Sequence, residues 1–324
     1  SSPSTPYTTN REGHGPAWQN SLFEDNAEFG YGMLMANKAI RERLKMHAEN
    51  IVNNCDCGVT DAAKAWLETF DDSTANKEPA AKFLAALKAA KPSAALKADV
   101  DAIIADGDYL AKKSIWIFGG DGWAYDIGFG GLDHVIASGE DVNILVFDTE
   151  VYSNTGGQAS KATPTGAIAQ FAAGGKVVKK KDLASIAMSY GYVYVAQIAQ
   201  GADYNQCIKA FTEAESYKGP SIIIGYAPCI NHGIRGGMTI AQSEEKAAVA
   251  SGYWNLFRFD PRKEKPFTLD SKEPTESYQD FILNEVRYSS LKRAFPEKAE
   301  NLFAKAEADA KKRYEMLKER AEAE

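Results

Sequence analysis

The chain has 324 residues, of which 44% are hydrophobic and 25% charged, so it can bury one large α/β core or two ordinary ones. Its formal net charge of -7 argues against a general binder of nucleic acid or of anionic membranes. Four cysteines are too few for a disulfide scaffold and favour a reducing compartment, and no apolar run approaches the length of a membrane span. Because the chain starts at Ser1 without a Met, we expect it to be a fragment of a longer protein.

Helical patterns dominate the first third of the chain. Residues 1–20 are rich in Pro, Ser, Thr, Asn and Gly, which is typical of an irregular segment. Apolar residues at helical spacing then predict a helix over about 21–53. Shorter helices are predicted over 61–70, 78–90 and 94–105, and we interpret about 54–113 as a helical insertion ahead of a sheet.

From residue 114 on, strands alternate with helices. Apolar runs predict strands over 114–118, 142–147, 192–196, 220–226 and 253–259, with helices between them over 123–138, 182–190, 204–216 and 240–251. This alternation is typical of a doubly wound, mostly parallel sheet with helices on both faces. We expect this α/β domain to span residues 1–260. The polar remainder, 261–324, with helices near 276–286 and 296–322, is predicted to be a C-terminal helical arm.

Polar residues follow the first two predicted strands, at the edge where open α/β sheets bind ligands. Asp121 can offer a carboxylate, Thr149 a hydroxyl and Val151 a backbone carbonyl, which are oxygen ligands of the kind that Mg2+ takes together with phosphate oxygens. Gly120 and Gly122 would let the backbone approach a diphosphate closely. A helix beginning near Trp123 would point its amino end at the same place.

Two other interpretations of the first cluster remain open. Gly119–Gly122 could be only a tight turn with a helix cap. A dinucleotide site would require the pattern G-x-G-x-x-G directly after the strand. Instead, three glycines fall inside the predicted helix, where they look like close-packing positions: Gly128, Gly130 and Gly131.

Longer strings surround these two clusters. Gly119–Gly128 reads GGDGWAYDIG and Asp148–Gln158 reads DTEVYSNTGGQ. Together they resemble the carboxy-terminal thiamine diphosphate-binding part of pyruvate:ferredoxin (flavodoxin) oxidoreductases. Three further stretches agree with that family: Ser2–Tyr7, Gly15–Asp25 and Tyr226–Ile230.

The resemblance implies roles for particular residues. Mg2+ would be bound by Asp121, Thr149 and the Val151 carbonyl, with the diphosphate against Gly120 and Gly122. Asn154 would lie next to the reactive carbon of the cofactor as a catalytic residue and hydrogen-bond the substrate, and Phe23 would pack against the cofactor. Asp126 is either a neighbour of the metal ligands or a residue of the helix surface.

Cys229 follows the predicted strand 220–226, where a lone cysteine is by default a small core residue. The resemblance implies instead that Cys229 is one ligand of a [4Fe–4S] cluster, which needs four thiolates. Cys55 and Cys57 have the wrong spacing, and Cys207 is predicted to be buried on a helix. The other three ligands would therefore come from outside this chain.

The histidines carry no zinc-like spacing with the cysteines. His232 could face the active site or simply be solvated or bonded to backbone. We interpret the others as structural: His14, His47 and His134.

The implied reaction is oxidative decarboxylation of pyruvate with coenzyme A to acetyl-CoA and CO2, with electrons passing through iron–sulfur clusters to ferredoxin or flavodoxin. The residue that activates the aminopyrimidine, the pyruvate-binding residues and the coenzyme A contacts would lie in other domains of the enzyme. We therefore expect this chain to be inactive alone and the complete enzyme to be a homodimer. No nucleic acid or membrane partner is expected, and the location would be the cytoplasm or an anaerobic organelle matrix.

Two alternatives stay open. The chain could be a β subunit of a related 2-oxoacid:ferredoxin oxidoreductase, although those subunits normally carry a Cys-x-x-Cys that is absent here. It could also be a non-catalytic fragment that assembles through its C-terminal arm.

Overall fold

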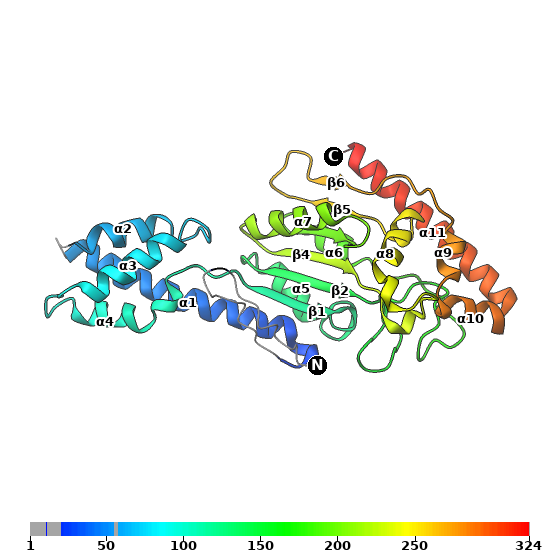
Figure 1. Ribbon diagram of the computed structural model, residues 1–324, viewed down its shortest axis with the longest axis horizontal. Coiled ribbons are helices and arrows are strands. Elements are labelled where there is room, and N and C mark those ends of the chain that lie inside the picture. The colour runs from blue at the N-terminus through cyan, green and yellow to red at the C-terminus, as the bar shows by residue number, and fades with distance from the viewer. Residues whose placement is uncertain (1–10, 12–20, 55–57, 324) are drawn as a thin grey trace. The chain divides into compact units, whose positions relative to one another are not determined.

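The computed structural model describes residues 11, 21–54 and 58–323 (Figure 1). The stretches Ser2–Tyr7 and Gly15–Asn20, and the side chains of His14, Cys55 and Cys57, lie outside the described residues. The contacts divide the chain into two compact units. Unit 1 contains Trp116–Glu324 and the chain up to Phe29, and unit 2 contains Gly30–Ile115.

Unit 2 is helical, as the sequence predicts. It contains most of α1 (Asn26–Asn54), which begins in unit 1, and α2 (Thr60–Glu68), α3 (Lys77–Ala89) and α4 (Lys97–Ala105). Leu44, Trp66, Phe83 and Ile103 are fully buried in its core. The buried Arg41 guanidinium donates to three backbone carbonyls in the segments that follow α2 and α4, which satisfies acceptors that the helices leave free: Phe70, Tyr109 and Leu110.

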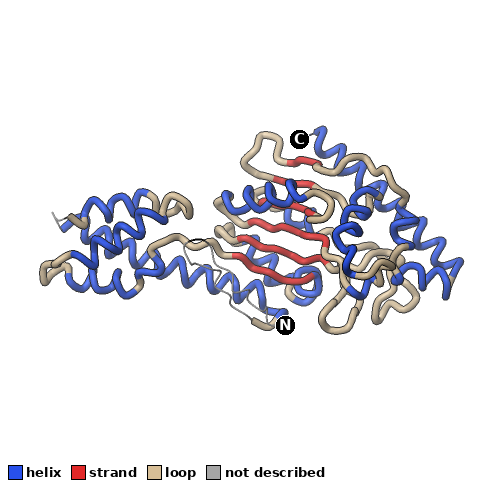
Figure 2. Tube along the Cα trace, viewed as in Figure 1, coloured by secondary structure: helices blue, strands red, loops and turns tan. Residues whose placement is uncertain are grey.

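Unit 1 is built on a six-stranded sheet in the order β1-β2-β4-β3-β5-β6 (Figure 2). β1 (Trp116–Gly120), β2 (Asn143–Asp148), β4 (Ser221–Tyr226) and β3 (Tyr194–Ile198) are parallel, whereas β5 (Phe257–Phe259) and β6 (Phe267–Leu269) are antiparallel. Ile144, Leu145 and Val146 are all buried although successive side chains point to opposite faces. Both faces of the sheet are therefore covered, which confirms the predicted α/β class.

The connecting helices of unit 1 are α5 (Phe129–Ala137), α6 (Leu183–Met188), α7 (Tyr204–Ser216) and α8 (Ala241–Ala250). Asp182 caps α6 and Asp203 caps α7, each accepting a hydrogen bond from the backbone three residues on. Ala210 and Ala214 of α7 lie in one apolar cluster with Leu145 of β2, so α7 covers one face of the sheet.

The helix predicted over 123–138 is instead two segments. Gly122–Ile127 forms a π-helical turn, and α5 begins only after Gly128. The Trp123 ring is buried against the backbone at Gly119 and Gly128, where a Cβ would overlap it. The helical amino end that the sequence predicts beside Asp121 is present, but it belongs to the short π-helical turn, whose N-cap is Asp121.

The chain beyond residue 260 is not a separate arm. β6 adds to the sheet edge, and α9 (Tyr278–Leu283), α10 (Val286–Ala294) and α11 (Pro296–Ala323) belong to unit 1. Figure 1 shows α8–α10 gathered beyond the ends toward which β2 and β4 point. Tyr288 and Phe303 are buried in this segment. Its composition is mostly polar, so the sequence pattern did not indicate these apolar contacts.

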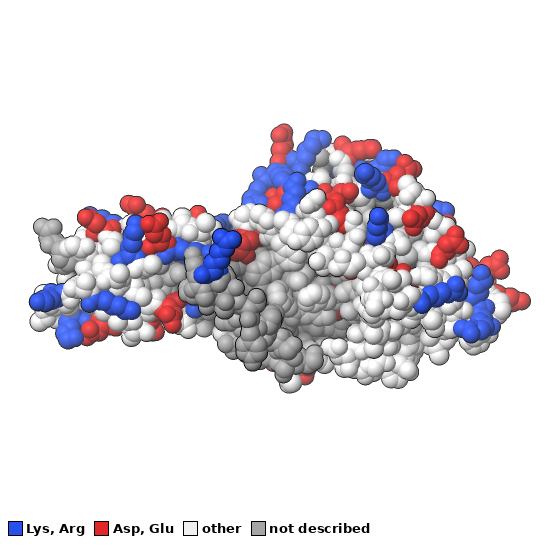
Figure 3. All heavy atoms as spheres, viewed as in Figure 1, with Lys and Arg blue, Asp and Glu red and all other residues white. Residues whose placement is uncertain are grey.

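Charged side chains of unit 1 gather over β5–β6 and the C-terminal helices on the face shown in Figure 3. The loops after the parallel strands expose apolar side chains instead, among them Phe171, Val178 and Ile230. In the described part of the chain, none of the helices combines the length and the apolar character that a membrane crossing requires.

We predict that Gly128→Ala destabilises unit 1 by ~1–3 kcal/mol, because the added Cβ overlaps the buried Trp123 ring. Gly130→Ala is the matched control, since its Cβ meets nothing within 4 Å and removing a helical glycine gains about 0.5–1 kcal/mol. Urea unfolding of both variants measures the difference. Equal stabilities would contradict the role assigned to Trp123.

Candidate functional site

Three strand ends meet at one edge of the sheet. β1, β2 and β4 are adjacent and parallel, with Gly120 in register with Phe147, and Asp148 with Tyr226. The residues that follow these strands therefore lie side by side. They are Asp121, Thr149 and the segment that leads to Cys229.

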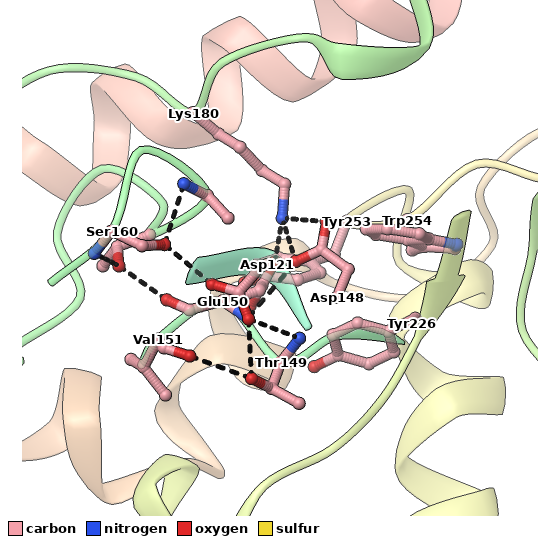
Figure 4. A network of polar contacts seen from close by, with 12 residues as sticks. Asp121, Asp148, Thr149, Glu150, Val151, Ser160, Lys180, Tyr226, Tyr253 and Trp254 are labelled. Atoms are coloured by element: carbon pink, nitrogen blue, oxygen red, sulfur yellow. Dashed lines mark hydrogen bonds and ion pairs between the residues drawn. The ribbon is translucent and has the colours of Figure 1, made fainter. Parts of the chain in front are cut away.

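Asp121, Thr149 and Val151 converge as predicted (Figure 4). The Thr149 Oγ1 lies 2.7 Å from Asp121 Oδ1 and 2.9 Å from the carbonyl oxygen of Val151. Since a hydroxyl has one hydrogen, it can donate to only one of these two acceptors at a time. The other Asp121 oxygen, Oδ2, accepts from Ser160 Oγ at 2.8 Å.

This set of oxygens fits a magnesium ion. Mg2+ takes octahedral oxygen ligands at 2.0–2.1 Å, which places adjacent ligands about 2.9 Å apart, close to the two spacings observed. Within residues 21–54 and 58–323, no group of three or more His, Cys, Asp or Glu side chains is arranged to hold a metal ion. A metal at Asp121 would therefore depend on the Thr149 hydroxyl, the Val151 carbonyl and oxygens from a ligand.

Asp121 is almost fully buried, and its pKa is raised to about 7. Burial is the main cause, and the charge of Asp148 adds to it, against hydrogen bonds from Thr149 and Ser160. A bound cation would favour the ionised carboxylate, whereas the metal-free site favours the proton near neutral pH.

A cluster of buried charges lies directly beside Asp121. Lys180 donates to Asp148 at 2.7 Å and to Glu150 at 3.2 Å, and Arg287 donates to Glu150 at 2.7 Å. Burial alone would raise the pKa of Glu150, but Lys180 and then Arg287 outweigh it and hold the pKa at about 2. Asp148 keeps a raised pKa despite Lys180, because it is completely buried and also lies near Glu150.

The two glycines predicted to face a diphosphate differ in their surroundings. A Cβ at Gly120 would meet only the Phe147 carbonyl oxygen, at 4.0 Å, so its surroundings are open. A Cβ at Gly122 would lie 2.6 Å from the Tyr152 ring, so this glycine is explained by packing. Phe23 is partly exposed and makes an edge-on contact with Tyr152, at 6.4 Å between ring centroids. Asn154 is exposed in the loop just after the turn.

Cys229 is buried, and its sulfur lies among polar groups. Ser153 Oγ lies 2.8 Å from Sγ, and the Asn231 backbone N and Nδ2 each donate to it at 3.4 Å. These contacts distinguish it from a cysteine packed only against apolar side chains. Cys207, the other described cysteine, is buried on α7 as predicted.

His232 is fully buried and lies within hydrogen-bonding distance of the Thr149 carbonyl, with 2.8 Å between Nε2 and the oxygen. The backbone-bonded interpretation of His232 is therefore correct, and its partner is in the turn that presents Thr149 and Val151. Asp126 accepts from the Lys161 backbone N and, at 2.9 Å, from Lys161 Nζ, so its carboxylate pairs with Lys161.

Sequence reasoning missed the residues around the predicted ligands: Glu150, Ser160, Lys180, Glu285 and Arg287. The basic run at Lys179–Lys181 was the single available signal for Lys180, and no motif selects one lysine from it. Arg287 lies far along the chain in a segment with polar composition. Its place beside Glu150 follows from tertiary structure alone.

Comparison with known proteins identifies the domain. Residues 91–224 match the family model described as thiamine pyrophosphate enzyme, C-terminal TPP binding domain. This part of the chain is therefore similar to the C-terminal domain of thiamine pyrophosphate enzymes. The matched range includes Asp121, Thr149, Val151 and Lys180, whereas Cys229 and Arg287 lie beyond it.

The relatives that this chain matches are longer enzymes. It is 57% identical to a pyruvate:ferredoxin oxidoreductase of Moorella thermoacetica over 99% of its own length, and 54% identical to a pyruvate-flavodoxin oxidoreductase of Klebsiella pneumoniae over 97%. The chain spans 28% and 27% of these two enzymes. The resemblance found in the sequence is thereby confirmed.

One solved structure is also similar, a 2-oxoglutarate:ferredoxin oxidoreductase from Magnetococcus marinus. It is 23% identical, with a TM-score of 0.34 over 40% of this chain and 44% of that chain. That likeness is too low to carry an argument about the site.

We predict that Asp121→Asn changes how metal-free stability depends on pH. An unfolded Asp titrates near ~3.9, so a folded pKa of about 7 means that stability is lost as the pH rises between these two values. The isosteric amide does not ionise, so the variant gains stability relative to the original chain between pH 5 and pH 8. Urea unfolding in EDTA at both pH values measures this gain, with Asp126→Asn as the control. An equal pH dependence for all three proteins would contradict the raised pKa.

Proposed function

We propose that this chain binds the diphosphate and metal end of thiamine diphosphate in a pyruvate:ferredoxin or pyruvate:flavodoxin oxidoreductase. The observation that carries the proposal is that Asp121 Oδ1 and the Val151 carbonyl oxygen both lie within 2.9 Å of Thr149 Oγ1. The thiamine pyrophosphate family match over the same residues supports it.

Mg2+ would be held by Asp121 Oδ1, Thr149 Oγ1 and the Val151 carbonyl. One carboxylate with two neutral oxygens leaves the remaining positions of an octahedral ion for diphosphate oxygens and water. Gly120 would give the diphosphate close access to the backbone, since its surroundings are open. Gly122 would act indirectly, by allowing Tyr152 to pack against the turn.

The surrounding residues would orient the rest of the cofactor and the substrate. Phe23 offers a partly exposed aromatic face beside Tyr152 for contact with the cofactor. Asn154, in the exposed loop after the turn, would hydrogen-bond the substrate. When bound, thiamine diphosphate would supply the carbanion that attacks the keto carbon and the electron sink for the pair left by CO2.

Cys229 would be one of four ligands of a [4Fe–4S] cluster, with the other three from outside this chain. The polar groups around its sulfur support this role, because hydrogen bonds to cluster sulfurs tune the reduction potential. The electrons would leave through such clusters to ferredoxin or flavodoxin.

The wider activity rests on the relatives, which are named as pyruvate oxidoreductases with ferredoxin or flavodoxin. We propose pyruvate and coenzyme A as substrates, acetyl-CoA and CO2 as products, and a homodimer of the complete enzyme. Its location would be the cytoplasm or an organelle matrix.

Calorimetry with thiamine diphosphate and Mg2+, on the complete protein that carries this sequence, tests the proposal. Asp121→Ala is expected to weaken cofactor binding about 100-fold or more, because it removes the one charged ligand of the metal. Asp126→Ala, which removes a carboxylate paired with Lys161 in the same segment, is expected to bind as the original protein does. No Mg2+-dependent binding by the original protein, or equal binding by Asp121→Ala, would overturn the proposal.

A further inference from the structure

The turn that presents Thr149 and Val151 has an unusual backbone. Glu150 has a φ of 60°, in the left-handed region that non-glycine residues rarely occupy. Its side chain is nevertheless buried, with 1% of its surface exposed. Such a conformation persists only when surrounding contacts enforce it.

Three donors hold the Glu150 carboxylate. Arg287 Nη2 donates to Oε2 at 2.7 Å and Tyr253 Oη donates to the same oxygen at 2.6 Å. Lys180 Nζ donates to Oε1 at 3.2 Å. The three donors come from different parts of the chain, and together they hold the Glu150 carboxylate (Figure 4 shows Lys180 and Tyr253).

A second contact holds the same turn one residue earlier. His232 Nε2 lies 2.8 Å from the Thr149 carbonyl, and His232 Nδ1 lies 3.5 Å from Glu285 Oε1. Arg287 Nε donates to Glu285 Oε2 at 2.6 Å. Glu285 thus pairs with Arg287 and lies beside His232, whose Nδ1 has no hydrogen-bond partner in the described part of the chain.

We propose that Arg287 is a positioning residue for the metal site. By fixing Glu150, it holds the turn in the conformation that brings Thr149 Oγ1 and the Val151 carbonyl next to Asp121. This inference rests on the proposed function, because it names what prepares the same site before a metal binds. Arg287 itself does not contact the metal ligands' oxygens; it acts through Glu150.

The geometry separates this role from that of an ordinary buried ion pair. Arg258 is also buried between two carboxylates, donating to Glu213 at 2.8 Å and to Asp270 at 2.8 Å. Those partners lie on α7 and just after β6, away from the turn. Arg258 and Arg287 thus have similar burial and charge but different neighbours, and they form a matched pair for mutation.

The experiment measures metal affinity and stability separately. Binding of Mn2+ as the probe is followed by electron paramagnetic resonance at saturating thiamine diphosphate, on the complete protein, with thermal unfolding in parallel. Arg287→Gln is expected to raise the Kd for Mn2+ about 10–100-fold, as is typical when a residue that orients a metal ligand is removed. Arg258→Gln is expected to lower the midpoint of thermal unfolding by a similar amount while its Kd for Mn2+ stays within about twofold of the original value.

Three results would decide against the inference or its basis. If the original protein binds no Mn2+ in the presence of the cofactor, the result contradicts the proposed function, on which the role of Arg287 rests. If it binds and Arg287→Gln binds equally well, Arg287 is only structural. If Arg287→Gln does not fold, Tyr253→Phe removes another donor to Glu150 Oε2 while keeping the aromatic ring. An unchanged Kd for Mn2+ in that variant overturns the inference, and a raised Kd supports it.

Discussion

Two carboxylates, Asp148 and Glu150, are buried at the end of a central parallel strand, and the site depends on how their charge is balanced. Lys180 and Arg287 provide the compensating cations at 2.7 Å. Removing one partner of a buried ion pair typically costs ~3–5 kcal/mol, because the other charge stays buried without compensation. The loop before α6 and the start of α10 must therefore both fold back onto this edge of the sheet.

This balance determines what Asp121 can do. The two neighbouring carboxylates pair with Lys180 and Arg287, whereas Asp121 accepts hydrogen bonds from the hydroxyls of Thr149 and Ser160. Burial and the charge of Asp148 raise its pKa to about 7, so a cation bound there would have to displace a proton near neutral pH. The same buried cluster that stabilises the fold thus leaves one acid available for ligand binding.

The C-terminal segment has a larger part in the site than its composition suggests. Charged residues are rarely buried, so Glu285 and Arg287 would ordinarily be placed on the surface. In the structure they are buried against each other, and Arg287 also pairs with Glu150, in the turn between Thr149 and Val151. The boundary at residue 260 stays a prediction, and it rested on hydropathy, which does not register a charge that is buried with its partner.

Short-range patterns in the sequence determined the α/β class, the parallel strands and the convergence of Asp121, Thr149 and Val151. These follow from apolar runs and from the rule that parallel strands end at one edge. Tertiary structure alone decided the π-helical break at Trp123, the left-handed turn at Glu150 and the cations that hold it. Each of these depends on contacts between residues far apart in the chain, such as Glu150 and Arg287, and local periodicity carries no information about such contacts.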